Sequence, residues 1–276
     1  MKCHVCFRHC DLSEGQRGFC RARINKNNEI VAENYGVISS IALDPIEKKP
    51  LNRFYPGSFI LSLGSYGCNL RCPFCQNHEI SQTGDRGFSK VDPEYIRDIA
   101  LREKVNGNIG VAYTYNEALT GYEFVRDTAK LIHEEGMKNV LVSNGTAEQQ
   151  VLSEILPYID AMNIDLKSFS EDVYRDVLMG DLKQTMDFIE EAAKHCHMEI
   201  TTLVVPGIND SEEEIREIAK WIAGLNGGKG EEIPYHLSRF FPQYKMTDRG
   251  ATPVDKIFAL TDVAGEYLKY VYAGNV

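Results

Sequence analysis

Short apolar runs alternate with amphipathic stretches from residue 58 to the end of the chain. Two helix starts are readable, at Asp92-Pro93 and in the Ser-Glu-Glu-Glu sequence at 211–214, and Thr252-Pro253 is expected to open the last helix. This alternation is typical of βα units and a parallel sheet, so six units predict an α/β fold, a partial (β/α)6 TIM-like barrel. The expected strands are residues 59–63, 109–113, 139–142, 161–166, 199–204 and 234–237.

Residues 1–58 lack this alternation. Short strand-like runs occur at 30–32 and 37–38, and prolines interrupt residues 44–51, where a loop is expected. Lys48 and Lys49 in that loop are expected to face solvent. We therefore predict a cysteine-rich N-terminal extension at 1–58 and the barrel at 59–276.

Length and charge narrow the class of protein. A chain of 276 residues is normal for one α/β barrel. Thirty basic against forty acidic side chains give a net charge of −10, which argues against nucleic-acid or anionic-membrane partners. We find no signal peptide and no uninterrupted apolar span, so a cytoplasmic location is expected.

Seven of the eight cysteines fall into two groups. Cys68, Cys72 and Cys75 follow the first barrel strand at C-x3-C-x2-C spacing. A structural zinc site normally has four protein ligands, so a zinc knuckle is the minor alternative, and disulfides are disfavoured in the cytosol. Three thiolates so close together favour a [4Fe–4S] cluster, in which one iron would lack a protein ligand.

The second group, Cys3, Cys6, Cys10 and Cys20, has C-x2-C-x3-C-x9-C spacing. Four thiolates make a closed site for zinc or for an auxiliary iron–sulfur cluster, and the sequence leans slightly to zinc. Cys196 stands alone between two histidines; because adjacent side chains point to different faces, we interpret it as a small buried thiol.

Phe74, directly before the third cysteine of the loop, completes a motif that resembles the radical SAM superfamily. Within that superfamily the chain is similar to the pyruvate formate-lyase-activating enzymes. Adding the N-terminal cysteines and Ala42-Leu43-Asp44-Pro45, it resembles the AmmeMemoRadiSam system radical SAM enzymes over nearly its whole length. It departs from that pattern at Glu117-Ala118, where a proline commonly follows the glutamate.

The resemblance implies two cofactors, a [4Fe–4S] cluster and S-adenosylmethionine (SAM). It implies reductive cleavage of SAM to a 5′-deoxyadenosyl radical that abstracts a hydrogen atom from the substrate. Cys68, Cys72 and Cys75 would bind iron, and Phe74 would cover the adenine. The other SAM-binding candidates lie at or just after the ends of the expected strands and are Thr114, Asn116, Glu117, Ser143, Asn144, Asp165, Lys167, Val205 and His236.

Simpler roles stay open for several of these residues. Glu117 can be a helix-start carboxylate, Asp165 and Lys167 a surface salt bridge, and His236 a satisfied barrel histidine. The resemblance also implies an electron donor such as flavodoxin or ferredoxin and a protein or peptide substrate. A small-molecule substrate and a non-catalytic, metal-bound scaffold remain the alternatives.

Overall fold

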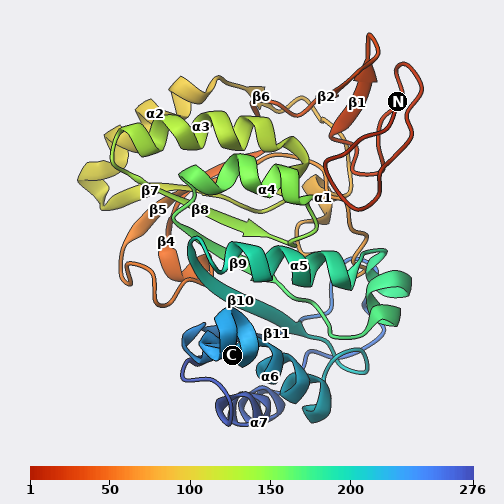
Figure 1. The fold of residues 1–276 in the computed structure, drawn as a ribbon, viewed down its shortest axis with the longest axis vertical. Helices are drawn as coiled ribbons and strands as arrows, with labels where there is room; N and C mark the ends of the chain where they lie inside the picture. Colours follow the sequence, from red (N-terminus) through yellow and green to blue (C-terminus); the bar gives the residue numbers. More distant parts are fainter.

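One eight-stranded sheet organises the computed structural model, which describes all 276 residues (Figure 1). The strand order is β12-β11-β10-β9-β8-β7-β5-β4. All six strands expected from the alternation are present as parallel neighbours, which confirms the α/β partial barrel. They are β5 (Phe59–Gly64), β7 (Asn108–Tyr113), β8 (Lys138–Ser143), β9 (Ala161–Asp165), β10 (His197–Val204) and β11 (Tyr235–Arg239).

Two edge strands extend this sheet beyond the six expected ones. β12 (Val271–Gly274) adds in parallel to β11, and β4 (Ser40–Pro45) pairs antiparallel with β5. The prediction of a loop at 44–51 was therefore wrong for its first two residues, Asp44 and Pro45, which are the last residues of β4. Pro45 is tolerated there because an edge strand has one free side. The sheet thus begins with β4, before residue 58. The division into an extension at 1–58 and a barrel at 59–276 stays a prediction.

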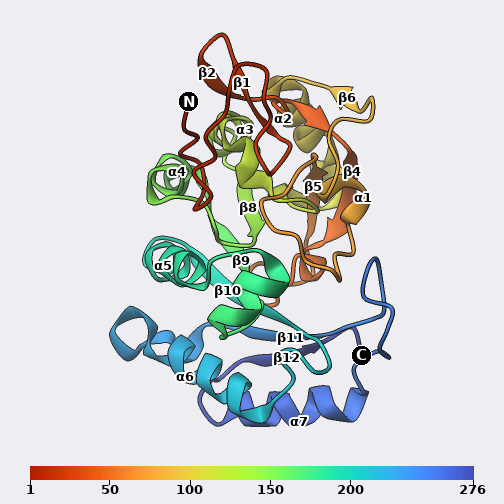
Figure 2. The ribbon, with the colours of Figure 1, turned by 90° about the vertical axis from the view of Figure 1, so that its right-hand side faces the viewer.

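Helices follow one another around the outside of the curved sheet, as Figures 1 and 2 show. The main hydrophobic core lies between these helices and the sheet. No helix is both long and apolar enough to cross a membrane. The helices are α1 (His78–Ser81), α2 (Pro93–Arg102), α3 (Tyr122–Glu134), α4 (Gln149–Ile155), α5 (Leu182–Ala192), α6 (Glu212–Gly228) and α7 (Val254–Gly265), with short 3-10 turns at Ile46–Lys48, Glu103–Asn106, Ala118–Gly121, Leu156–Tyr158 and Gly230–Glu232 and a π-helical turn at Val173–Leu178.

Two of the three expected helix starts are confirmed. Asp92 Oδ1 accepts a hydrogen bond from Tyr95 N at 2.8 Å, and Ser211 Oγ accepts one from Glu214 N at 3.2 Å. Glu214 does not complete the capping box, because its carboxylate accepts from Ser168 Oγ after β9. Glu214 therefore connects α6 to the turn that follows β9.

The third helix start was misplaced by the sequence. α7 begins at Val254 with Pro253 as its cap residue, and Pro253 provides no side-chain cap. Thr252 instead points inward, where its Oγ1 donates to the carbonyl oxygen of Val204 at 2.6 Å. The Thr-Pro pair therefore joins the helix to the end of β10.

The N-terminal segment lies at one end of the sheet, beside α3 (Figure 1). It contains the hairpin β1 (Arg23–Lys26) and β2 (Glu29–Ala32), and then β3 (Val37–Ile38), which pairs with β6 (Ser89–Lys90). An ion pair of 2.6 Å between the buried Arg23 and the partly buried Glu123 holds the hairpin to α3.

Residues 46–54, here called the floor segment, close the barrel at the N-terminal ends of its strands. Ile46, Leu51 and Phe54 form a small core with apolar residues that begin or line β5, β7, β8 and β9. Asn163 Nδ2 donates to the carbonyl oxygen of Pro50 at 2.8 Å. The expected loop is thus a packed element of the barrel.

The floor segment changes the interpretation of its two lysines. The side chain of Lys48 is 67% exposed, as expected, but that of Lys49 is only 2% exposed. The expectation for Lys49 was wrong because proline-rich composition does not reveal that the segment folds into the barrel.

Candidate functional site

A cavity of about 710 Å³ opens at the carboxyl ends of the barrel strands. Its volume falls in the range of small-molecule and cofactor sites. The structure brings most of the predicted site residues to its lining, although they come from four different strand ends. These are Cys68, Cys72, Phe74, Cys75, Thr114, Asn116, Glu117, Ser143, Asn144, Asp165 and Lys167.

Two of the predicted SAM-binding residues, Val205 and His236, lie outside this lining. Val205 is buried at the end of β10, where its N–H donates to Asn209 Oδ1 at 2.6 Å. His236 lies deeper in the barrel, with Nε2 2.6 Å from the buried Glu199 and its ring stacked on Tyr272. The geometry of His236 matches the alternative of a satisfied barrel histidine.

The three thiols of the cysteine loop line one cavity, and no fourth cysteine joins them there. This donor set fits a cluster with several irons, each taking one thiolate. No group of three or more Cys, His, Asp or Glu side chains in the structure converges on a single metal ion. Burial raises the pKa of Cys68 well above its ordinary value and that of Cys72 to about 11, so thiolate formation calls for a nearby cation such as iron.

Asn116 holds the backbone that leads into the cysteine loop. Its Oδ1 accepts from Ser65 N at 2.9 Å and its Nδ2 donates to the carbonyl oxygen of Gly67 at 3.1 Å. Gly67 has φ +93°, and a Cβ there would lie 2.6 Å from the carbonyl oxygen of Cys20. Only glycine allows this approach, so the loop is fixed just before Cys68.

Glu117 joins the ends of two strands. Its buried carboxylate accepts hydrogen bonds of 2.8 Å from Ser143 Oγ and from Asn144 N. It also accepts from Leu119 N at 3.1 Å, so the helix-start role is present as well. Burial raises the pKa of Glu117, even though these hydrogen bonds oppose the shift.

Asn144 connects this carboxylate to the cysteine loop. Its Nδ2 lies 3.7 Å from Cys68 Sγ and donates to Asn69 Oδ1 at 2.9 Å. Asn69 in turn donates to Thr146 Oγ1 at 2.7 Å. Hydrogen bonds to ligand sulfurs tune cluster potentials. Sequence reasoning missed Asn69 and Thr146; the only sign was a buried polar residue directly after the first cysteine of the loop.

Asp165 and Lys167 form an ion pair of 2.9 Å that lines the cavity. Burial alone would lower the pKa of Lys167, but the effect of the neighbouring Asp165 carboxylate is larger, so the pKa is raised. Asn209 Nδ2 donates to the carbonyl oxygen of Lys167 at 2.7 Å and fixes the strand end. Because the pair lines the cavity and the Lys167 side chain is mostly buried, it is not the surface salt bridge that the sequence left open as an alternative.

The N-terminal segment docks on the cysteine loop through two arginines. The guanidinium carbons of Arg8 and Arg71 lie 3.5 Å and 3.8 Å from the centre of the Phe19 ring. Arg8 Nε donates to the carbonyl oxygen of Asn69 at 2.8 Å, and Arg71 donates to that of Cys68 at 2.8 Å. Nothing in the sequence distinguished either arginine, because these contacts are long-range.

The four N-terminal cysteines form no disulfide, and Cys3 and Cys20 are buried. Burial raises the pKa of Cys6 to about 12, and the nearby Cys20 and Cys3 thiols add to the shift. The four thiols do not converge on a single ion, so the second metal centre stays a prediction.

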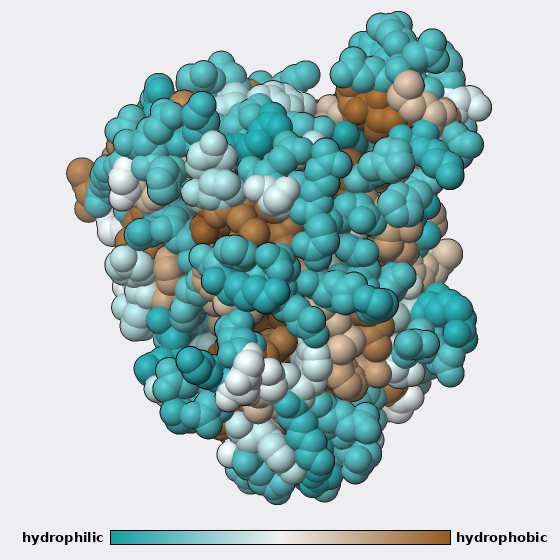
Figure 3. Space-filling view, viewed as in Figure 1, coloured by the Kyte–Doolittle hydropathy of each residue, from teal (hydrophilic) through white to brown (hydrophobic).

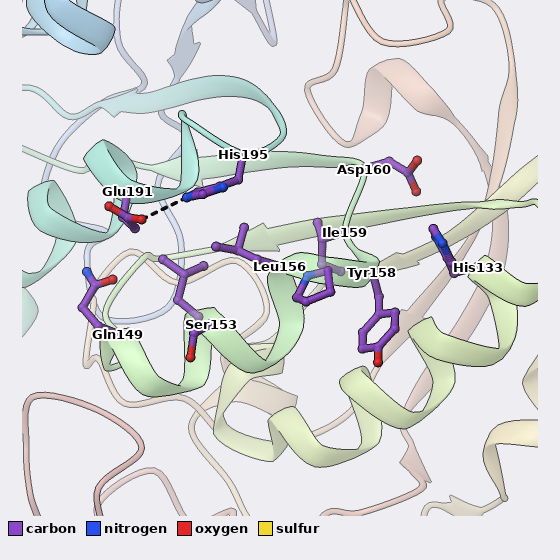
Figure 4. Close-up of a pocket in the computed structure, with 11 residues that line it drawn as sticks. His133, Gln149, Ser153, Leu156, Tyr158, Ile159, Asp160, Glu191 and His195 are labelled. Carbon is purple, nitrogen blue, oxygen red and sulfur yellow. Dashed lines mark hydrogen bonds and ion pairs between the residues drawn. The ribbon is translucent and has the colours of Figure 1, made fainter.

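Another hollow, of about 770 Å³, opens on the outer face and contains none of the predicted site residues (Figure 4). Figure 3 shows a mostly hydrophilic surface here, with apolar side chains in hollows between helices. His195 lines this hollow and pairs with Glu191 at 3.0 Å, whereas His197 turns to Glu199. The two histidines beside Cys196 therefore do not form a common metal site, and Cys196 itself is only partly buried rather than fully buried as predicted.

The comparison with known families agrees with this site. The model of the radical SAM superfamily matches residues 63–222, which include the cysteine loop and most of the barrel. The chain belongs to the radical SAM superfamily. A [4Fe–4S] cluster and SAM are the cofactors that this family implies, and the cavity described above has the donor set for them.

Relatives refine the placement within the superfamily. An uncharacterized protein of Methanocaldococcus jannaschii is 41% identical over all of this chain and 81% of its own length. A pyruvate formate-lyase-activating enzyme of Clostridium pasteurianum is 30% identical over 69% of this chain and 83% of its own length. These relatives confirm the expected similarity to the pyruvate formate-lyase-activating enzymes.

Solved structures show the same fold. Streptococcus suis SuiB bound to its precursor peptide SuiA has a TM-score of 0.58, covering 76% of this chain and 47% of SuiB. The sequence identity is 12%, so this likeness concerns the barrel alone.

Replacing Asn116 tests whether it fixes the cysteine loop. Asn116→Ala leaves the Ser65 N–H without its partner, so we expect a loss of about 1–3 kcal/mol in the free energy of unfolding. Urea unfolding measures this loss, and iron per chain after anaerobic reconstitution should fall with it. The exposed Asn106→Ala change should stay within about 0.5 kcal/mol of the unchanged protein. Equal stability of both variants would contradict the assigned role.

Proposed function

We propose that this protein is a radical SAM enzyme that abstracts a hydrogen atom from a protein or peptide, in the manner of glycyl-radical activases. One observation carries the proposal: three thiols without a fourth cysteine line the same cavity as Glu117 and the Asp165–Lys167 pair. When bound, a reduced [4Fe–4S] cluster supplies the electron that cleaves SAM to methionine and the 5′-deoxyadenosyl radical.

The chain's own residues hold and orient the cofactors in this proposal. Cys68, Cys72 and Cys75 hold the cluster, and the buried Phe74 borders the adenine. Glu117, Asp165 and Lys167, which line the same cavity, would position the amino-acid and ribose ends of SAM.

The remaining predicted residues have smaller parts. Thr114, Ser143 and Asn144 line the cofactor side, and Asn116 positions the loop. Val205 and His236 make no direct contact in this proposal. The chain binds SAM in a cavity walled by strand ends, which limits access of water to the radical.

The substrate class is suggested by the relatives. The similar Clostridium enzyme is named for activating pyruvate formate-lyase, and the SuiB structure contains a precursor peptide. A small-molecule substrate is the second candidate, because a cavity of about 710 Å³ is typical of small-ligand sites.

Partners and location follow from the same chemistry. We propose a one-electron donor such as flavodoxin or ferredoxin. We also propose a cytoplasmic location, where eight free cysteines stay reduced. With a net charge of −10, nucleic acids and anionic membranes are not among the proposed partners.

Anaerobic reconstitution with iron and sulfide tests the reaction. The reconstituted protein with dithionite and SAM should form 5′-deoxyadenosine. Cys68→Ser should lower the rate at least about a hundredfold, because one iron loses its thiolate. Cys196→Ser is the matched control and should keep the rate, since Cys196 lies outside the cavity.

Iron-loaded protein that forms no 5′-deoxyadenosine would support the scaffold alternative instead. In the same assay, deuterium transfer into 5′-deoxyadenosine separates the substrate classes. Transfer from a peptide with deuterated glycine supports the activase-like reaction, whereas transfer only from small molecules favours the second candidate.

We further propose that Cys3, Cys6, Cys10 and Cys20 bind a second metal centre. Their position beside the cysteine loop, with Cys68 N donating to the Cys20 carbonyl oxygen at 3.2 Å, makes the N-terminal segment a structural support for that loop. Zinc and an auxiliary iron–sulfur cluster are both compatible with four thiolates.

Metal analysis of an N-terminal variant tests the second centre. Changing Cys6 and Cys10 to serine should remove one equivalent of zinc, or an auxiliary cluster's iron, and leave the metal bound by the cysteine loop. Equal zinc and iron contents in the variant and the unchanged protein would contradict a second centre.

A further inference from the structure

Four residues outside the predicted set line the cavity near its floor. Asp44 comes from β4, Lys48 and Lys49 from the floor segment, and Tyr115 from the turn after β7. Asp44 Oδ2 accepts from Lys49 Nζ at 2.8 Å and from Tyr115 OH at 2.5 Å. The cluster therefore joins residues 44–49 to Tyr115, which lies 71 positions after Asp44 in the sequence.

The position of Tyr115 is strongly constrained. Its φ is +70°, in the left-handed region that non-glycine residues rarely adopt. Asn77 Nδ2 donates to its carbonyl oxygen at 2.8 Å, and a Cβ at Gly64 would lie 2.9 Å from its ring. Strained backbone of this kind persists where the surroundings impose it and is frequent at ligand sites.

The cluster holds more positive charge than its own carboxylate needs. Asp44 is already paired with the buried Lys49, and those hydrogen bonds outweigh burial and lower the pKa of Asp44 to about 2. Lys48 adds a second ammonium group, 3.4 Å from Asp44 Oδ1 and with its side chain 67% exposed. Two ammonium groups beside one carboxylate leave one net positive charge.

No other charged group of the cavity forms an ion pair with Lys48 or Lys49. Lys167 is paired with Asp165, and the carboxylate of Glu117 accepts from Ser143 and from backbone N–H groups. Lys48 is thus the cavity cation with the weakest partner. Burial lowers the pKa of Lys49 and the like charge of Lys48 lowers it further, a cost that a bound anion would relieve.

We propose that Lys48 and the Asp44–Lys49–Tyr115 cluster form a substrate subsite that binds one carboxylate group. This inference rests on the proposed function and adds the substrate class: a molecule with a carboxylate near the hydrogen-bearing carbon. A singly charged carboxylate balances the one net positive charge of the group formed by Asp44, Lys48 and Lys49. Lys48 contacts the substrate carboxylate, while Asp44 and Tyr115 fix the position of Lys49 through their hydrogen bonds.

Ligand-detected saturation-transfer NMR on the reconstituted full chain tests the subsite with two pairs of probes. N-acetylglycine and N-acetylglycinamide represent a small acid and its neutral counterpart. The blocked dipeptides acetyl-Gly-Asp-amide and acetyl-Gly-Asn-amide represent a peptide source of the same group. In one of the two pairs, we expect the acid to bind at least about tenfold more tightly than its amide. The pair that shows this preference tells whether the carboxylate comes from a small acid or from a peptide.

Charge variants assign this preference to the subsite. Lys48→Gln should remove the tenfold preference, and Lys48→Arg should restore most of it. Lys104→Gln, at an exposed lysine outside the cavity, is the matched control and should keep it. Equal binding of acid and amide, failure of both acids to bind at millimolar concentration, or an unchanged preference in Lys48→Gln overturns the proposal.

This test and that of the proposed function fail independently, because probe binding needs no cleavage of SAM. Protein that prefers the acid but forms no 5′-deoxyadenosine overturns the reaction alone. Protein that cleaves SAM but binds acid and amide equally overturns the subsite alone.

Discussion

The loop that carries Cys68, Cys72 and Cys75 is fixed by hydrogen bonds to its backbone from two sides. Asn116 bonds it from the barrel, and the carbonyl oxygen of Cys20 and the Arg8–Phe19–Arg71 stack hold it from the N-terminal segment. Residues that bind a metal or a cofactor must be held in position by the packing and hydrogen bonds of their neighbours. The three thiols can therefore stay in place while one side of the cavity remains open for another ligand.

The opposite end of the barrel is closed by the floor segment. Glu199 accepts hydrogen bonds from Asn52 N and Arg53 N at 3.0 Å and 2.8 Å, and the small core around Leu51 fills the space between the strands. Closure there leaves the cavity at the strand ends as the place where chemistry can occur. It also places Lys48 and Lys49 in a cavity that their sequence context did not suggest.

Much of the barrel could be predicted because buried parallel strands leave clear apolar runs and the carboxyl ends of neighbouring strands meet. That rule brought Glu117, Asp165 and Lys167 to one cavity. The edge strands β4 and β12 escaped notice because most of their residues are exposed or only partly buried, which leaves a weak apolar pattern. The sequence left two roles open for His236 because its depth in the barrel depends on the register of β11, which a strand assignment with uncertain ends does not supply.

The central claim is that the cysteine loop holds a four-iron cluster in which one iron has no protein ligand. Mössbauer spectroscopy of protein reconstituted anaerobically with ⁵⁷Fe, recorded with and without SAM, tests this claim directly. The account predicts that SAM shifts the signal of about one quarter of the cluster iron. A spectrum that SAM leaves unchanged, or a loop that holds a single zinc ion, would contradict it.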